Sequence, residues 1–76
     1  MDPKARVWAQ LKDVLDPETG VNLVDLGVVR RVEAEAELVR IALDPGHPLA
    51  KHFQTEAEAA GRDALPGWKI VVELAA

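Results

Sequence analysis

The sequence predicts an α+β fold, a two-layer α/β domain in which two helices cover one face of a small mixed sheet. The expected order is helix–strand–strand–helix–strand. Apolar residues recur at helical spacing in segments 3–15 and 48–64, and they alternate with polar residues in segment 68–74. Proline, glycine and aspartate gather in the breaks between these segments. Because 76 residues leave room for one core, we expect a single domain over residues 1–76.

The first helix is expected to run from Pro3 to Leu15. Asp2 can cap its free amides, and proline suits a first helical turn. The apolar residues of this segment share one helical face: Val7, Trp8, Leu11, Val14 and Leu15. The helix should end before Asp16-Pro17, since a residue that precedes proline resists helical angles. Its place on the apolar face favours Trp8 as a core residue over a stacking platform.

Segment 16–27 contains two short acidic turns on either side of an apolar centre. In Asp16-Pro17-Glu18-Thr19-Gly20, proline suits the second turn position and glycine can adopt a positive φ. The apolar centre consists of Val21, Leu23 and Val24. We therefore expect a loop that is held against the core.

A β-hairpin is expected next. The β-branched run 28–32 predicts the first strand, 33–36 the turn, and 37–43 the second strand. The second strand should place one set of side chains on one face (Val39, Ile41 and Leu43) and another set on the opposite face (Leu38, Arg40 and Ala42). The turn lacks the Asn-Gly pair that favours tight hairpins, and its residues also form helices well.

The second half of the chain predicts a helix and a final strand. Pro48 should lie in the first turn of a helix whose core face is rich in small residues (Leu49, Phe53, Ala57, Ala60 and Ala64). Pro66-Gly67 predicts a type II turn before strand 68–74. Since a helical crossover separates them, this strand should run parallel to the second strand. The sequence leaves open which strand lies beside it.

The composition narrows the classes of function. The net charge is −4 and the nine basic residues are dispersed, which argues against nucleic acid and anionic membranes as partners. The absence of cysteine excludes disulfides, thiolate nucleophiles and cysteine-ligated metals within this chain. No signal-peptide pattern or apolar run of membrane-spanning length is visible, so we expect a cytoplasmic protein.

Two groups of side chains are candidates for chemistry. Asp16, Glu18 and Asp25 could serve in acid–base catalysis or bind a hard metal ion. The favoured alternative is that the aspartates accept hydrogen bonds from local amides in turns. His47 and His52 are five residues apart, which places them on different helical faces, unlike a zinc-binding i, i+4 pair.

His52 should face solvent, whereas His47 lies at a helix N-terminus where an anion or a metal-bound ligand could bind. The favoured alternative for a lone loop histidine is a turn or capping residue. The sequence shows no nucleophile–base pair, glycine-rich phosphate loop or serine. We therefore expect neither an enzyme nor a built metal site.

Residues 11–29 closely resemble the signature of the PaaD/SufT-type family of iron–sulfur (metal–sulfur) cluster assembly proteins. The motif positions that carry the resemblance are Asp16, Pro17, Glu18, Gly20, Asp25 and Gly27. The similarity extends from about Val7 to Leu74 and implies a small α/β domain with the same element order. It also implies a role in maturing iron–sulfur proteins, as a carrier or as an adaptor that recruits targets.

The resemblance further implies a reactive cysteine directly before a proline, in the loop between the second strand and the second helix. His47-Pro48 occupies that place, and Asp44 stands near a position where the family has threonine. Many relatives continue with a tail that contains proline and tryptophan, so this chain looks like a cysteine-less, C-terminally short member. The residues implied to line a cofactor site, an iron–sulfur cluster in the family, are His47, Asp44 and Asp25.

The resulting expectation is an accessory protein in iron–sulfur cluster assembly or target maturation, acting as an adaptor or a degenerate carrier. Its partners would be other assembly proteins or apo targets. The alternative is a non-catalytic interaction module with a decayed site, including a phenylacetate-pathway-type accessory. Metal-dependent hydrolysis by Asp16, Glu18 and His47 is a third, weaker hypothesis. A homodimer is also expected to be feasible, since the sheet has exposed edges and Val71 lies on its less covered face.

Overall fold

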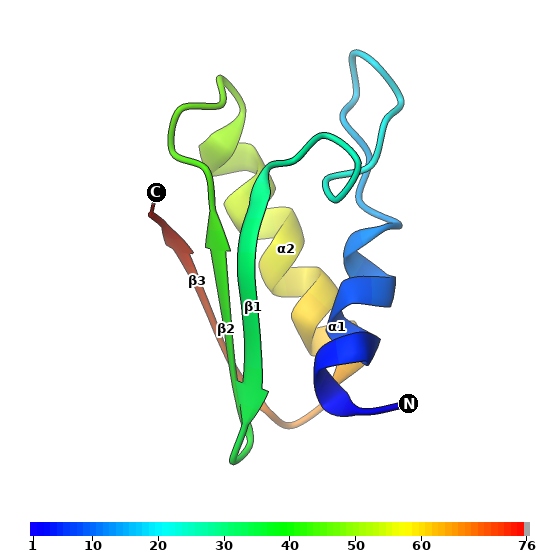
Figure 1. The fold of residues 1–76 in the computed structure, drawn as a ribbon, viewed down its shortest axis with the longest axis vertical. Coiled ribbons are helices and arrows are strands. Elements are labelled where there is room, and N and C mark those ends of the chain that lie inside the picture. The colour runs from blue at the N-terminus through cyan, green and yellow to red at the C-terminus, as the bar shows by residue number, and fades with distance from the viewer. Residues whose placement is uncertain (76) are drawn as a thin grey trace.

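The computed structural model describes residues 1–75. It contains the expected elements in the expected order: α1 (Pro3–Leu11), β1 (Val29–Glu35), β2 (Leu38–Leu43), α2 (Ala50–Ala64) and β3 (Lys69–Leu74). The two helices pack against each other and lie on the same side of the sheet, which forms the second layer (Figure 1). The α+β prediction is therefore confirmed. No helix among these residues is long and apolar enough to cross a membrane.

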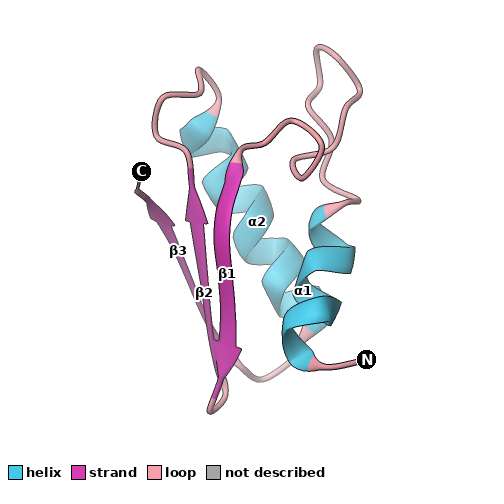
Figure 2. Cartoon of the chain, viewed as in Figure 1, coloured by secondary structure: helices cyan, strands magenta, loops and turns pink. Residues whose placement is uncertain are grey.

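The strand order is β1-β2-β3, which answers the question that the sequence left open. β1 and β2 form an antiparallel hairpin, whereas β2 and β3 are parallel, as the crossover through α2 requires. β2 is consequently the central strand, and β1 and β3 form the two edges of the sheet (Figure 2).

The core lies between the helices and the inner face of the sheet. β2 contributes Val39, Ile41 and Leu43, all fully buried as the alternation predicts. α2 contributes Phe53, which is also fully buried. Ala42 points to the outer face but is only 4% exposed, because it is small and its strand has neighbours on both sides. Trp8 packs at the margin of the core and is half-buried.

α1 is shorter than predicted, because it ends at Leu11 and not at Leu15. The N–H groups of Asp13 and Val14 bond to carbonyls three residues back, which closes a tight final turn. The chain then extends, and Leu15 forms an isolated antiparallel bridge with Asn22. This pairing within the loop overrides the helical pattern of the segment, and Leu15 is 54% exposed.

The hairpin turn also lies later than predicted. β1 continues through Glu35, which pairs with Leu38, so Ala36 and Glu37 alone form the turn. Their φ angles of 51° and 62° are typical of a type I′ turn, although neither residue is glycine or asparagine. The longer ladder of backbone hydrogen bonds outweighs the cost of two left-handed residues.

α2 packs unusually close to β3 at Gly61. A Cβ atom at this position would lie 2.8 Å from Cγ2 of Ile70. The small residues predicted for the core face, Ala57, Ala60 and Ala64, are buried as expected. The Pro66-Gly67 turn is also confirmed, since the Gly67 φ is 87° and the N–H of Trp68 bonds to the Leu65 carbonyl at 3.1 Å.

Candidate functional site

The candidate site lies where two loops meet at one end of the domain. Residues 12–28 connect α1 to β1, and residues 44–49 connect β2 to α2. The N–H of Asp44 donates a hydrogen bond of 2.8 Å to the carbonyl of Val28, so the second loop begins directly beside the end of the first. Both loops leave the same end of the sheet (Figure 2).

Asp44 holds the start of the second loop in place. Its Oδ1 atom accepts a hydrogen bond from the N–H of Gly46 at 2.9 Å, and its Oδ2 atom lies 3.2 Å from the guanidinium of Arg30. Arg30 is the extra residue of a β-bulge, because Val29 pairs with Leu43 and Arg31 with Ala42. No sequence signal singled out Arg30, since a bulge becomes visible only when two strands are aligned.

His47 lies in the loop just before the second helix. Its Nδ1 atom accepts a hydrogen bond from the N–H of Leu49 at 3.0 Å, and its carbonyl accepts one from Ala50 at 3.0 Å. These bonds occupy amides that a helix N-terminus otherwise leaves without partners. Pro48 was expected inside the first helical turn, but α2 starts at Ala50 and Pro48 lies in the turn before it.

The hydrogen bond from Leu49 occupies one of the two ring nitrogens of His47. Because Nδ1 accepts this bond, a neutral ring in this geometry carries its N–H group on Nε2. Metal binding at Nε2 would move that hydrogen to Nδ1 and break the bond to Leu49. The structure therefore shows His47 as a turn residue directly before α2, whose N-cap residue is Leu49.

Asp25 supports the turn in which it lies. Its Oδ2 atom accepts a hydrogen bond of 2.9 Å from the side-chain amide of Asn22. The Oδ1 atom of Asn22 in turn accepts from the N–H groups of Val24 and Asp25, each at 3.0 Å. Asn22 carried no prediction, although asparagine commonly organises a turn in this way. Asp25 therefore holds the Asn22 side chain in place from the exposed surface of the first loop.

The other motif residues also shape the first loop. Asp16 is only 5% exposed, and its Oδ1 atom accepts from the N–H of Glu18 at 2.8 Å. Gly20 has a φ of 73° and donates to the Asp16 carbonyl at 2.8 Å. This arrangement agrees with the turn-forming alternative for Asp16. Leu23 is buried as predicted, whereas Val21 is 38% exposed and so does not pack in the core.

A shallow pocket of about 310 Å³ adjoins the second loop. His47 and His52 both line it, and their ring centroids lie 5.2 and 5.6 Å from the Phe53 ring centroid. His52 is exposed, in agreement with its predicted orientation. Within residues 1–75, no three or more histidine, aspartate or glutamate side chains gather as a metal site would require.

Comparison with known proteins agrees with this architecture. A sequence model of a family described as iron–sulfur cluster assembly protein matches residues 4–73. This chain belongs to that family. An uncharacterised protein from Methanocaldococcus jannaschii is 32% identical over 79 aligned residues, which cover 96% of this chain and 83% of that protein. A crystal structure of a domain of unknown function (DUF59) from Bacillus anthracis superposes with a TM-score of 0.81 at 27% identity, covering 96% of this chain and 74% of that one.

Membership of this family raises the question of whether an iron–sulfur cluster fits the residues present. Such clusters are held mainly by cysteine thiolates, and this chain has no cysteine. The His47 Nδ1 atom accepts from Leu49, and Asp44 is engaged with Gly46 and Arg30. These donors do not fit a cluster held by this chain alone.

Proposed function

We propose that this protein is a non-enzymatic accessory of iron–sulfur cluster assembly or target maturation, and that it acts as an adaptor between other proteins. We assign it to the PaaD/SufT-type branch of the family and to the cytoplasm. Its partners would be other assembly proteins or apo targets. One observation carries the proposal: the place where the family's reactive cysteine is expected holds His47, whose ring accepts a hydrogen bond from Leu49 directly before α2.

The adaptor role is favoured over the carrier role by the chemistry of the donors. A carrier must bind its cargo, and soft thiolates are the ligands that retain iron–sulfur clusters in proteins. This chain offers only carboxylates and two histidines, and the two aspartates at the candidate site already have hydrogen-bonding partners. Recruitment of other proteins needs only the surface of the domain.

Anaerobic reconstitution separates the two roles. The purified protein is incubated with ferrous iron and sulfide, desalted, and examined by visible absorption and by metal analysis. We expect a colourless protein with substoichiometric iron. A stable brown product with stoichiometric iron and sulfide would overturn the adaptor-only proposal and restore the carrier.

Affinity capture at native expression level tests recruitment directly. The tagged protein should recover iron–sulfur assembly components or their apo targets above the level of an unrelated tagged domain of similar size. Recovery of neither class would contradict the adaptor role. In that case the chain would be better described as an interaction module outside this pathway.

A second candidate, an interaction module with a decayed site, is supported by the hydrogen bonds that occupy Asp44, His47 and Asp25. The two candidate functions differ in whether the site takes part in binding partner proteins. If the site has decayed, His47→Asn and Asp25→Asn should leave partner capture unchanged. Loss of captured assembly proteins in either folded variant would tie recruitment to the site itself.

A further inference from the structure

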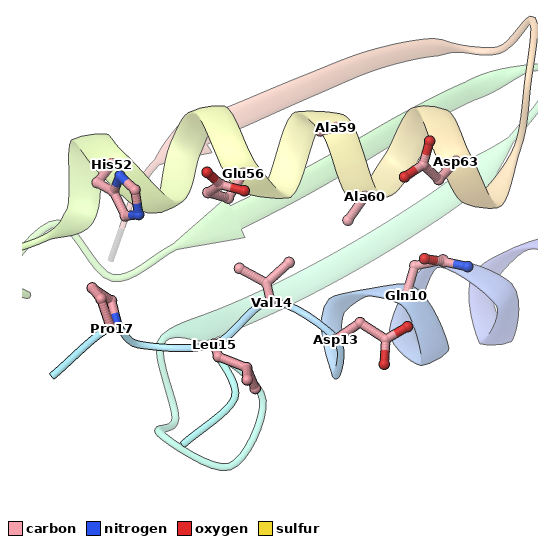
Figure 3. A pocket seen from close by; sticks show the side chains of 10 residues that line it. All are labelled: Gln10, Asp13, Val14, Leu15, Pro17, His52, Glu56, Ala59, Ala60 and Asp63. Atoms are coloured by element: carbon pink, nitrogen blue, oxygen red, sulfur yellow. The ribbon is translucent and has the colours of Figure 1, made fainter. Parts of the chain in front are cut away.

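A groove of about 330 Å³ separates α2 from the end of α1 and the turn that follows it. We call it the helix groove; residues 10–17 form one wall and residues 52–63 form the other. Figure 3 shows side chains from α2 facing side chains from the opposite wall along its length. His47, Asp44 and Asp25, the residues implied to line a cofactor site, do not line this groove.

The walls offer apolar surface. Val14, Leu15 and Pro17 line one side, and Ala59 and Ala60 line the other. Leu15 is 54% exposed, so much of its aliphatic side chain is open to solvent. Its exposure is built into the fold, because the bridge to Asn22 holds this backbone in an extended form. The groove therefore presents a fixed aliphatic contact to solvent.

The groove is also strongly acidic. Three carboxylates line it, Asp13 on one wall and Glu56 and Asp63 on the other, and no lysine or arginine does. Among residues 1–75, none of these carboxylates takes part in an ion pair. His52 lies at one end and is the sole basic side chain of the lining. When charges of one sign line a concave surface, their electric fields add and are concentrated inside it.

The spacing of the carboxylates excludes a single metal ion as the occupant. The described residues contain no group of three acidic or histidine side chains close enough to share one ion. Figure 3 shows Glu56 and Asp63 at separate places along α2, with Asp13 across the groove. Several separated negative charges beside aliphatic surface complement a polypeptide that carries both basic and aliphatic side chains.

We infer that the helix groove docks a basic, leucine-containing segment of a partner protein. Arginine or lysine side chains of the segment pair with Asp13, Glu56 and Asp63, and an aliphatic side chain packs on Leu15. Arginine suits these sites because its planar guanidinium bonds a carboxylate through two parallel hydrogen bonds. This inference adds a docking surface to the proposed adaptor role. It rests on that role in taking the occupant to be part of a protein.

Fluorescence anisotropy with a defined probe tests the groove. The probe is a fluorescein-labelled ten-residue peptide in which arginine alternates with leucine, and its control carries glutamate in place of arginine. We expect saturable binding of the basic peptide alone. The variant Asp13→Asn/Glu56→Gln/Asp63→Asn should weaken this binding at least tenfold, and Leu15→Gln should weaken it severalfold.

A matched variant controls for net charge. Glu33→Gln/Glu35→Gln/Glu37→Gln removes the same three charges from exposed positions of the hairpin, away from the groove. We expect it to bind the peptide nearly as well as the unaltered protein at 150 mM salt. Equal weakening by both triple variants would mean non-specific attraction and would overturn the inference. Circular dichroism confirms that each variant is folded.

Backbone amide chemical shifts locate the bound peptide. We expect the largest changes on titration in residues 13–17 and 52–63. Changes centred on the outer face of the sheet would contradict the groove. Changes in the groove that depend on protein concentration without peptide would identify a second copy of this chain as the occupant, which also overturns the inference.

The affinity capture described above separates this inference from the adaptor role. If the groove variant captures assembly proteins as well as the unaltered protein does, the groove inference fails and the adaptor role stands. If the peptide docks in the groove but no assembly protein is captured, the groove is a docking site and the adaptor role fails.

Discussion

The ring nitrogen Nδ1 of His47 accepts a hydrogen bond from the backbone N–H of Leu49 at 3.0 Å. His47 occupies the position where the family resemblance implies a reactive cysteine. The hydrogen bond gives this residue a structural role. A ring nitrogen that accepts a backbone hydrogen bond in the turn before a helix is not free to bind metal. The loop formed by residues 44–49 can therefore keep its backbone conformation without the reactive cysteine that the family resemblance implies.

Replacing His47 should show how much its hydrogen bond with Leu49 contributes to stability. His47→Ala removes the acceptor and should lower the free energy of unfolding by about 1 kcal/mol, the usual net contribution of one hydrogen bond. His47→Asn supplies an oxygen at a similar place and should restore most of the loss. Urea denaturation measures both. Equal stability of the alanine variant and the unaltered protein would show that the bond contributes nothing.

A cysteine placed at position 47 should be unusually reactive. His47→Cys puts a thiol at the N-terminus of α2, where the helix dipole favours the thiolate. Because the chain has no other cysteine, alkylation by iodoacetamide reports on this site alone. We expect severalfold faster alkylation at pH 7 than in Thr55→Cys, a matched variant at an exposed position within α2. Slower reaction at position 47 would contradict the expectation.

Gly61 should not tolerate alanine despite its place in a helix. The added methyl group would lie 2.8 Å from Cγ2 of Ile70, an atom on a β-branched side chain that cannot rotate away freely. Overpacking typically costs about 1–3 kcal/mol, which outweighs the gain of about 1 kcal/mol in helix propensity. Thermal denaturation should show a lower Tm for Gly61→Ala.

A double-mutant cycle checks the cause of that loss. Ile70→Ala alone removes core packing and destabilises the protein, yet it also makes room for a methyl group at position 61. The combined variant should therefore be less destabilised than the sum of the two single variants. Simple additivity would indicate that Ile70 is not the residue that excludes alanine.

The hairpin turn should gain stability from better turn residues. Ala36 and Glu37 have φ angles of 51° and 62°, which cost an ordinary residue about 1 kcal/mol each. The variant Ala36→Asn/Glu37→Gly matches the preference of type I′ turns and should raise the free energy of unfolding by about 1–2 kcal/mol. As a control, Glu35→Gly in the adjoining strand should lower it. A neutral result for the turn variant would argue against the left-handed geometry.

Much of the fold could be predicted because its signals are local. The alternation in 68–74, the apolar face of α2 and the proline–glycine breaks each act within a few residues, and the observed elements follow them. Two of the boundaries that were wrong share one physical cause. Val14-Leu15 and Glu33-Ala34-Glu35 have helix or turn character locally, but the structure pairs Leu15 with Asn22 and residues 33–35 with β2 in a strand-like way.

The candidate site was only partly predictable for a related reason. Asp16, Gly20 and Asp25 could be recognised as turn residues from their neighbours along the chain. Arg30 could not, because its role depends on a bulge against β2, whereas Asn22 organises its own turn through neighbouring residues and was overlooked. The helix groove was equally hidden, since Asp13 and Glu56 come together only when the two helices pack.

The sequence by itself determined the class of fold, the order of its elements, the family resemblance and the lack of any thiol. These properties depend on composition and on short-range periodicity. Tertiary structure alone decided which strand lies beside β3, where α1 ends, and that Leu15 is exposed on one wall of the helix groove. It also decided that the His47 ring accepts a hydrogen bond from Leu49, because a hydrogen bond depends on the three-dimensional course of the backbone around the side chain.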